Sequence, residues 1–272
     1  MQLNIYNESV ELELCPHILV GGCSGSGKTY LLKSMLCDVL ESSEDCRVLV
    51  IDPKSVDYQF LRGKVDFVRD VRVMDGQDEE QDDEGRGKYG MLGCYGSDGS
   101  LGNVVKSVKF DNKLWLERGL SLLSRADIES GNVLRWLSNI NLEMDRRYNV
   151  MMSDGSVSWS GSKIVVFIDE LADLLWWDKS DVAKRAGVKG RVEDLLVRLA
   201  TMGRAAGIHL ILGTQRPDAG ILSGQLRGNL GCRVCLRAVN NIERRIILGD
   251  SCREMGEKVL YYGGEYKELV RG

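Results

Sequence analysis

The sequence predicts an α/β protein with a mainly parallel β-sheet flanked by helices. Three observations predict this class. Short apolar runs alternate with amphipathic segments, a glycine-rich turn joins the first buried run to the first helical segment, and a later apolar run ends in two adjacent acids. This alternation is the pattern of a parallel sheet whose crossover helices cover its faces. A chain of 272 residues is long enough for one large domain with a full core.

Five short apolar runs are expected to form strands: His17–Val20, Val48–Ile51, Ile164–Ile168, Ile208–Leu212 and Arg233–Leu236. Three longer segments carry apolar side chains at helical spacing and are expected to form helices. Their apolar stripes run over residues 31–40, 133–148 and 192–199. Strands and helices therefore follow one another as a parallel sheet requires.

The pattern fails between about Val73 and Gly131. Asp75–Glu84 holds seven acidic residues and no basic one, and a glycine- and serine-rich stretch follows it. Such a segment is too polar to repay its ordering entropy, so Met74–Asn103 is expected to be a mobile loop or insertion. A helix is expected over Trp115–Leu123. We therefore assign one domain, 1–272, with an insertion or mobile segment over 74–132. Its acidic run serves as a solvated spacer, repels a polyanion or binds a basic partner.

The composition and the cysteine spacing indicate the cellular compartment in which the protein acts. No window approaches twenty apolar residues, and the start of the chain lacks the features of a signal peptide, so we expect a cytoplasmic protein without a membrane segment of its own. Eight irregularly spaced cysteines do not suggest a disulfide framework. Cys232 and Cys235 lack a second pair at zinc-site spacing and are expected to be core residues. His17 and His209 are isolated, and no catalytic role is expected for them.

Charge is unevenly distributed along the chain. The formal net charge is −4, yet the stretch from Arg198 to Ile247 contains eight arginines, no lysine and two acids. By itself such a stretch is a solvated face or a surface for a polyanion.

A phosphate-binding loop is predicted between the first strand and the first helix. The motif G-x-x-x-x-G-K-[ST] is matched by Gly22, Cys23, Ser24, Gly25, Ser26, Gly27, Lys28 and Thr29. Glycines let the backbone turn its N–H groups inward, and the helix that follows adds a partial positive charge. Lys28 is expected to reach the β- and γ-phosphates of a nucleoside triphosphate, and Thr29 to ligate Mg²⁺.

An acidic partner for this loop follows the strand IVVFI. Asp169 is expected to hold the metal through its water shell, and Glu170 to orient and polarise the attacking water. The presence of Glu170 indicates a protein that hydrolyses the nucleotide rather than one that only binds it. The run LGTQRP ends another strand, and its polar Gln215 is a candidate sensor of the γ-phosphate.

With these motifs in place, the chain resembles the motor domain of the FtsK/SpoIIIE DNA translocases, within the HerA–FtsK group of RecA-like ATPases. The matching stretches occur in the family's order: PHILVGGCSGSGKT, VLVIDPK, MDRRY, IVVFIDELADLL, RAAGIHLILGTQRP and IERRIILGD. They cover most of the chain outside Met74–Asn132, and VLYYGGEYKELVRG looks like the motor's last strands. DELADL and RAAGIHLILGTQRP are much more specific than a phosphate-binding loop alone.

The resemblance implies a RecA-like fold that binds ATP and Mg²⁺, and a hexameric ring with double-stranded DNA in its central hole. Arg204 looks like the arginine that reaches into a neighbouring subunit's ATP site, a contact typically worth about 10³–10⁵ in rate. Residues at DNA-facing positions of the family are Thr214, Arg216, Arg227, Asn241 and Arg245. At Asn241 the family often has lysine. Arginines there would grip the DNA backbone without reading its sequence.

The membrane anchor, the preceding domain and the DNA-reading winged helix of long family members have no counterpart in these stretches. We therefore expect a compact motor suited to a plasmid, conjugative element or phage, with a recruiting protein choosing the DNA. Two alternatives stay open. One is a coupling or secretion ATPase that moves a DNA–protein complex or a protein cargo, and the other is a nucleotide-dependent switch without directional movement.

Overall fold

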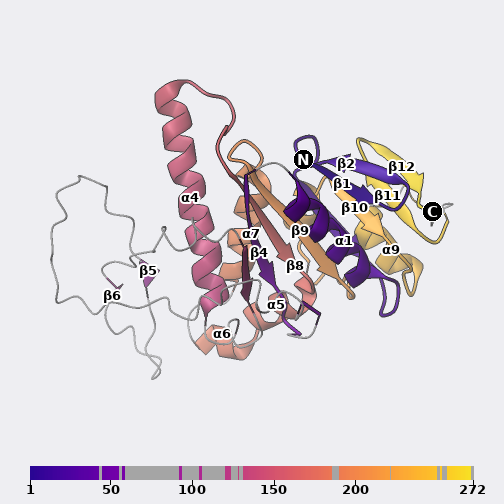
Figure 1. Ribbon diagram of the computed structural model, residues 1–272. Coiled ribbons are helices and arrows are strands. Elements are labelled where there is room, and N and C mark those ends of the chain that lie inside the picture. Colours follow the sequence, from indigo (N-terminus) through magenta and orange to yellow (C-terminus); the bar gives the residue numbers. More distant parts are fainter. Residues whose placement is uncertain are drawn as a thin grey trace, which may run out of the picture.

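The computed structural model describes residues 1–42, 45–54, 57–58, 92–93, 104–105, 120–123, 128, 131–185, 190–220, 222–249, 252 and 256–270. An eight-stranded sheet dominates this part of the chain, in the order β12-β11-β10-β3-β9-β8-β4-β7 (Figure 1). Its strands are β3 (His17–Gly21), β4 (Cys46–Ile51), β7 (Leu120–Leu123), β8 (Lys163–Ile168), β9 (Ile208–Thr214), β10 (Cys232–Cys235), β11 (Val259–Tyr262) and β12 (Glu265–Glu268).

The strands from β10 to β7 are all parallel, and β11 and β12 extend the sheet as an antiparallel hairpin at one edge. Although β9 comes late in the chain, it lies between β3 and β8, with His17 opposite Leu210 and Ile168 opposite Leu212. The carboxyl ends of β3, β9, β8 and β4 therefore meet at one edge of the sheet.

Helices and a small hairpin cover the sheet. The helices are α1 (Lys28–Glu41), α4 (Asn132–Asp154), α5 (Leu171–Asp178), α6 (Asp181–Arg185), α7 (Arg191–Met202), α8 (Gly224–Asn229) and α9 (Asn241–Leu248). The hairpin consists of β1 (Gln2–Ile5) and β2 (Glu8–Glu11), and a separate pair of two-residue strands consists of β5 (Leu92–Gly93) and β6 (Val104–Val105). Among the helices in the described part of the chain, none combines the length and apolar character needed to cross a bilayer.

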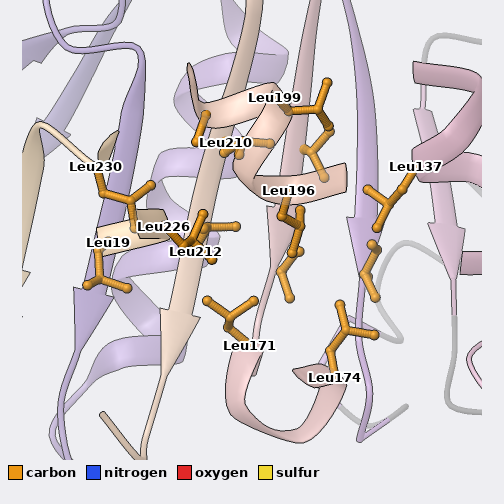
Figure 2. Close-up of a cluster of buried hydrophobic side chains, with 14 of the residues drawn as sticks. Leu19, Leu137, Leu171, Leu174, Leu196, Leu199, Leu210, Leu212, Leu226 and Leu230 are labelled. Atoms are coloured by element: carbon orange, nitrogen blue, oxygen red, sulfur yellow. The ribbon is translucent and has the colours of Figure 1, made fainter. Parts of the chain in front are cut away.

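Strand residues alternate between two apolar cores, one on each face of the sheet. On one face Leu19, Val166 and Leu210 pack with residues of α4, α5, α7, α8 and α9. Figure 2 shows this cluster, with the leucines of α7 between those of β9 and α4. On the other face Ile18 and Val165 pack with α1 and the β1–β2 hairpin. A strand buried on both faces reads as an unbroken apolar run, which is why these strands are visible in the sequence.

The structure confirms the five predicted strands to within a few residues and the three predicted helices as α1, α4 and α7. It also confirms that VLYYGGEYKELVRG contains the last two strands, β11 and β12. Cys232 and Cys235 are buried in β10, as expected of core residues. Within the described residues there is no cluster of side chains suited to hold a metal by protein ligands alone.

The prediction of a helix over Trp115–Leu123 is wrong for the carboxyl end of that segment. Leu120–Leu123 form β7, which pairs in parallel with β4 and completes the sheet edge. The N–H of Asp52 also donates to the carbonyl oxygen of Leu123 at 2.8 Å. Leucine and serine permit either structure locally, and the open edge of β4 decides for a strand because it supplies hydrogen-bond partners.

This strand also changes the expected insertion over 74–132, because residues 120–123 belong to the central sheet and Asn132 begins α4. Within the remaining segment, β5 and β6 pair in antiparallel fashion. The acidic run at Asp75–Glu84 lies outside the described residues.

Two histidines are enclosed in the sheet. The N–H of Leu210 donates to Nδ1 of His17 at 3.2 Å, and His17 is 1% exposed. Burial lowers the pKa of His17 to about 3, and the nearby His209 contributes to the same effect. Burial also lowers the pKa of His209 to about 4. Both imidazoles are therefore neutral in the folded protein near pH 7.

We predict that these histidines weaken folding in mild acid. In the unfolded chain they protonate near pH 6.5, whereas in the folded protein they do so only near pH 3 to 4. Stability is therefore full above about pH 6.5 and is lost as the pH falls, by about 2 kcal/mol per histidine between pH 7 and pH 5. Urea unfolding of the protein and of His209→Leu at both pH values measures the effect.

The variant is needed because burial raises the pKa of Asp169 and Glu170, and these carboxyl groups change the free energy of unfolding in the opposite direction. The pH-dependent loss should be about 2 kcal/mol smaller in His209→Leu than in the unaltered protein. An equal loss in both proteins would contradict the prediction.

Candidate active site

The candidate site lies at the carboxyl edge of the parallel strands, where ligands of open α/β sheets bind. The loop after β3 contains the predicted phosphate-binding motif, and Asp169 and Glu170 follow β8. Gln215 follows β9, which lies between those two strands. The structure therefore brings together the residues that the sequence predicts for nucleotide binding and hydrolysis.

Glycines shape the phosphate-binding loop. Gly25 and Gly27 have φ angles of 74° and 92°, which side chains other than glycine rarely adopt. A Cβ on Gly22 would lie 2.6 Å from Oγ of Ser26 and 3.0 Å from Cβ of Leu236. That hydroxyl is buried without a hydrogen-bond partner among the described residues. The loop is therefore compact, and its shape depends on glycine at these positions.

Helix α1 begins at this loop. Its first backbone hydrogen bond joins the N–H of Leu31 to the carbonyl oxygen of Gly27 at 3.0 Å. The N–H groups that precede Leu31, including those of Lys28 and Thr29, have no carbonyl acceptor within the helix. They are suited to bind anionic oxygens, an arrangement typical of phosphate sites.

Strands on both sides hold the loop in place. The N–H of Gly22 donates to the carbonyl oxygen of Thr214 at 3.2 Å, at the end of β9. The N–H of Cys23 donates to the carbonyl oxygen of Arg237 at 2.8 Å, beyond the end of β10. The loop is thus fixed between the two neighbours of β3.

Lys28 contacts the predicted metal-binding acid directly. Its Nζ donates to the carbonyl oxygen of Asp169 at 2.7 Å and lies 3.5 Å from Oδ1 of the same residue. It also lies 4.0 Å from Oε2 of Glu170. All three side chains are almost fully buried. The ammonium group therefore compensates two carboxyl groups that would otherwise be costly to bury.

The donor set fits a hard cation. Oδ2 of Asp169 is buried without a hydrogen-bond partner among the described residues, so this acid retains an unused acceptor. Burial raises the pKa of Asp169, and the charge of Lys28 opposes this effect. A divalent cation beside this oxygen would satisfy it and favour its ionised form. Thr29 is half-buried and directly follows Lys28.

Glu170 is held by the residue that follows β9. The N–H of Gln215 donates to Oε1 and Oε2 of Glu170 at 2.9 and 3.0 Å. Burial raises the pKa of Glu170, and the charge of Lys28 and the Gln215 hydrogen bond oppose this effect. A fixed carboxylate with a raised pKa is suited to accept a proton from water. The side chain of Gln215 is half-buried. Its role as a sensor of the γ-phosphate stays a prediction.

Three further residues belong to the site and were not predicted. Asp52 follows β4 and accepts N–H bonds from Lys54 at 3.1 Å and Tyr58 at 3.4 Å. The hydroxyl of the buried Tyr58 donates to Oδ1 of Asp169 at 3.5 Å. Nζ of Lys54 lies 3.8 Å from Oε2 of Glu170. An acid at the end of a buried strand was a usable signal for Asp52, whereas nothing local in the sequence marks Tyr58.

Arg204 lies at the opposite edge of the sheet. It is exposed in the turn between α7 and β9, whereas Gln215 follows the other end of β9. The seven residues of β9 separate the two edges by about 20 Å at 3.3 Å per residue. An arginine side chain cannot cover that distance, so Arg204 does not reach the phosphate-binding loop of its own chain.

Buried contacts hold the turn that carries Arg204. Nη1 of Arg147 donates to the carbonyl oxygen of Ala206 at 2.7 Å, and the Arg147 side chain is 1% exposed. The N–H of Trp159 donates to the carbonyl oxygen of Ala205 at 2.8 Å, and the Arg147 guanidinium lies 4.9 Å from the Trp159 ring centre. These contacts give the MDRRY stretch a structural role, because Arg147 belongs to it.

The predicted DNA-facing residues differ in exposure. Arg216, Asn241 and Arg245 are exposed. Arg227 is half-buried, and its Nη1 donates to the carbonyl oxygen of Ile246 at 3.4 Å, which joins α8 to α9. Thr214 is 2% exposed, which disfavours its predicted contact with DNA. Its Oγ1 accepts the N–H of Arg216 at 3.1 Å, so this side chain shapes the turn.

Comparison with known sequences identifies the family of this domain. The FtsK/SpoIIIE family profile matches residues 66–219, more than half of the chain, and the profile of the helicase HerA central domain matches residues 10–111. The chain is 27% identical over 97% of its length to DNA translocase FtsK of Mesorhizobium japonicum. It is 29% identical over 90% of its length to DNA translocase SpoIIIE of Bacillus subtilis. It spans 28% and 26% of the length of these two relatives.

Solved structures show the same fold at lower sequence identity. The monomer of the pCW3 conjugation coupling protein TcpA with ATPγS superposes with a TM-score of 0.65 at 20% identity, over 95% of this chain and 60% of that one. The cytoplasmic domain of the Thermomonospora curvata Type VII secretion ATPase EccC gives 0.60 at 18% identity, over 94% and 25%. The bacterial conjugative coupling protein TrwB gives 0.56 at 13% identity, over 100% and 89%. The predicted RecA-like P-loop fold is thereby confirmed.

We predict that Gly22→Ala weakens binding of ATPγS at least tenfold without unfolding the protein. The added methyl group would lie 2.6 Å from Oγ of Ser26, so the loop must shift. The double variant Gly22→Ala/Ser26→Ala removes this nearest atom and should recover part of the affinity. Isothermal titration calorimetry measures the affinities.

The matched control is Gly228→Ala in α8, where an added Cβ meets nothing within 4 Å. It should bind ATPγS as the unaltered protein does. Unchanged affinity in Gly22→Ala would show that the loop does not contact the nucleotide.

Proposed function

The chain belongs to the FtsK/SpoIIIE family, and we propose that it is the ATP-hydrolysing motor of a double-stranded DNA translocase. The observation that carries the proposal is the buried contact of Lys28 with Asp169 and Glu170 beneath a glycine-shaped phosphate loop. The family supplies the cargo class, because the relatives named above are DNA translocases.

The chemistry follows from the position of each side chain. The phosphate loop and the N-terminus of α1 bind the phosphates of ATP through backbone N–H groups. Lys28 leaves the carbonyl oxygen of Asp169 and extends to the β- and γ-phosphates. Thr29 and Asp169 would hold Mg²⁺, which neutralises charge on the phosphates when bound. Glu170, fixed by the Gln215 N–H, orients a water molecule and takes its proton.

Arg204 is proposed to complete the ATP site of a neighbouring subunit. Its place at the far edge of the sheet supports this role, because it cannot reach the site of its own chain. A head-to-tail interface in which each subunit offers this edge to the next generates a ring when the rotation between subunits closes. We propose a ring of six, as the family resemblance implies.

DNA is proposed to run through the ring along the exposed residues Arg216, Asn241 and Arg245. Arg227 lies at the junction of α8 and α9, and its basic charge adds to this surface. Guanidinium groups bind phosphate oxygens through paired donors, so the grip is independent of sequence. We further propose that the motor acts in the cytoplasm, where ATP is available and the free cysteines of the described residues stay reduced.

We predict that long duplex DNA stimulates ATP hydrolysis by the assembled protein. Lys28→Ala should abolish hydrolysis because phosphate binding is lost. Glu170→Gln should lower the rate by at least about a hundredfold and retain ATP binding, because only the proton acceptor is removed. Steady-state phosphate release with and without DNA measures both effects. Equal rates with and without DNA would exclude the DNA motor and favour a protein cargo or a nucleotide switch.

Salt dependence separates DNA from protein cargo. If the arginine surface contacts phosphates, the logarithm of the DNA affinity should fall with the logarithm of salt concentration, with a slope of about −0.9 per contact. Arg245→Gln should make this slope less steep by about one contact, whereas Arg191→Gln, at the exposed start of α7, should not change it. An affinity insensitive to salt would contradict this surface.

Mixed rings test the role of Arg204. Arg204→Ala and Lys28→Ala should each be inactive by itself, because every interface lacks one component. In an equal mixture, about a quarter of the interfaces in a head-to-tail ring combine an intact site with an intact Arg204, so about a quarter of the activity should return. Absence of recovery in rings shown to be mixed would contradict action between subunits.

A further inference from the structure

Arg237 lies beside the phosphate-binding loop on the side away from the two acids. It follows β10, and its carbonyl oxygen accepts the N–H of Cys23 at 2.8 Å. Its side chain turns over the same loop: Nε donates to Sγ of Cys23 at 3.4 Å. Nη2 lies 3.9 Å from the position that a Cβ on Gly25 would occupy. The guanidinium thus lies next to the part of the loop whose backbone turns to receive phosphates.

The contacts of this side chain leave most of its donors available. A thiol is a weak hydrogen-bond acceptor, and Sγ of Cys23 is the acceptor that the described part of the chain provides for it. The nearby charge of Glu257 acts on the guanidinium electrostatically. Arg237 is exposed, so it can bind an anion that enters the loop without first breaking a buried ion pair.

The sheet order indicates which phosphates Arg237 faces. Strand β3 lies between β9 and β10. Asp169 and Glu170 approach the loop across β9, and the transferred γ-phosphate must lie on their side because Glu170 orients the attacking water. Arg237 approaches from β10, on the opposite side. The phosphates nearest to it are therefore those that stay in ADP.

We propose that Arg237 binds the retained phosphates of the nucleotide, so that it determines affinity for ATP and ADP alike and takes no part in the hydrolytic step. The proposal rests on the nucleotide site of the proposed function. It separates Arg237 from Arg216, Arg227 and Arg245 of the same arginine-rich stretch, for which DNA is the proposed ligand. A guanidinium suits this role because its fork of donors matches phosphate oxygens and its charge is constant with pH.

Calorimetric titration of the protein with ADP and with ATPγS, in the absence of DNA, tests the proposal. In Arg237→Gln both dissociation constants should rise by the same factor, about tenfold, which corresponds to about 1.4 kcal/mol. Arg237→Lys keeps the charge and loses the fork, so its loss should be smaller. The rate of hydrolysis at saturating ATP should stay within about twofold of the unaltered protein, with the loss confined to KM.

Arg191→Gln is the matched control, since Arg191 is an exposed arginine at the start of α7. It should leave both dissociation constants unchanged, and the unfolding temperatures of all variants are compared with that of the unaltered protein. Unchanged ADP affinity in Arg237→Gln would overturn the proposal. So would a loss restricted to ATPγS, because Arg237 would then face the transferred phosphate, and so would an equal loss in Arg191→Gln.

The same measurements distinguish failure of the proposed function from failure of the role proposed for Arg237. If the unaltered protein binds both nucleotides, loses affinity in Arg237→Gln and yet hydrolyses ATP equally with and without DNA, the DNA motor fails and the role of Arg237 stands. If the unaltered protein binds neither nucleotide, both proposals are overturned.

Discussion

The contact between Lys28 and Asp169 is the interaction on which the candidate site depends. The two residues are 141 positions apart in the chain, and Nζ of Lys28 lies 2.7 Å from the Asp169 carbonyl oxygen. They meet only because β3, β9 and β8 are parallel and adjacent, so that the residues after each strand emerge at one edge. Without the lysine, two almost fully buried carboxyl groups would have to be protonated or exposed.

The same strand order gives the domain two functional edges. The phosphate loop, the acids and Arg237 lie where the strands end, and Arg204 lies where β9 begins. The length of the strands keeps the two edges apart. A reaction that needs groups from both edges must therefore involve two molecules of the protein. The buried Arg147 and the half-buried Trp159 fix the Arg204 turn to α4 and to the loop before β8.

The arginine-rich stretch is divided by the fold into groups with different surroundings. Arg204 is at the amino edge, Arg237 is beside the phosphate loop, and Arg227 joins α8 to α9. Arg233 donates to the carbonyl oxygens of Arg227 and Leu230 and supports the same region from β10. The roles proposed for the arginines of this one stretch therefore differ and include nucleotide contact, subunit contact, DNA contact and internal structure.

Much of this domain could be predicted from local sequence. Strands buried on both faces appear as apolar runs, and α1, α4 and α7 appear as stripes at helical spacing, because burial acts on residues close together in the chain. The phosphate loop was recognisable because glycine at 22, 25 and 27 answers a local backbone requirement. Lys28, Asp169 and Glu170 could be predicted as site residues because each lies directly next to, or at the start of, a strongly marked element.

Contacts between distant segments were decided by the tertiary structure alone. Leu120–Leu123 became a strand because the edge of β4 offered hydrogen-bond partners, a fact absent from its own residues. Thr214 was expected at the DNA and is buried, because β9 is inserted between β3 and β8. Tyr58 reaches Asp169, and Arg237 reaches Cys23, through pairings of strands far apart in the chain. Local sequence determines which elements form, whereas their neighbours in the sheet determine which side chains meet, because that choice depends on the packing of the whole chain.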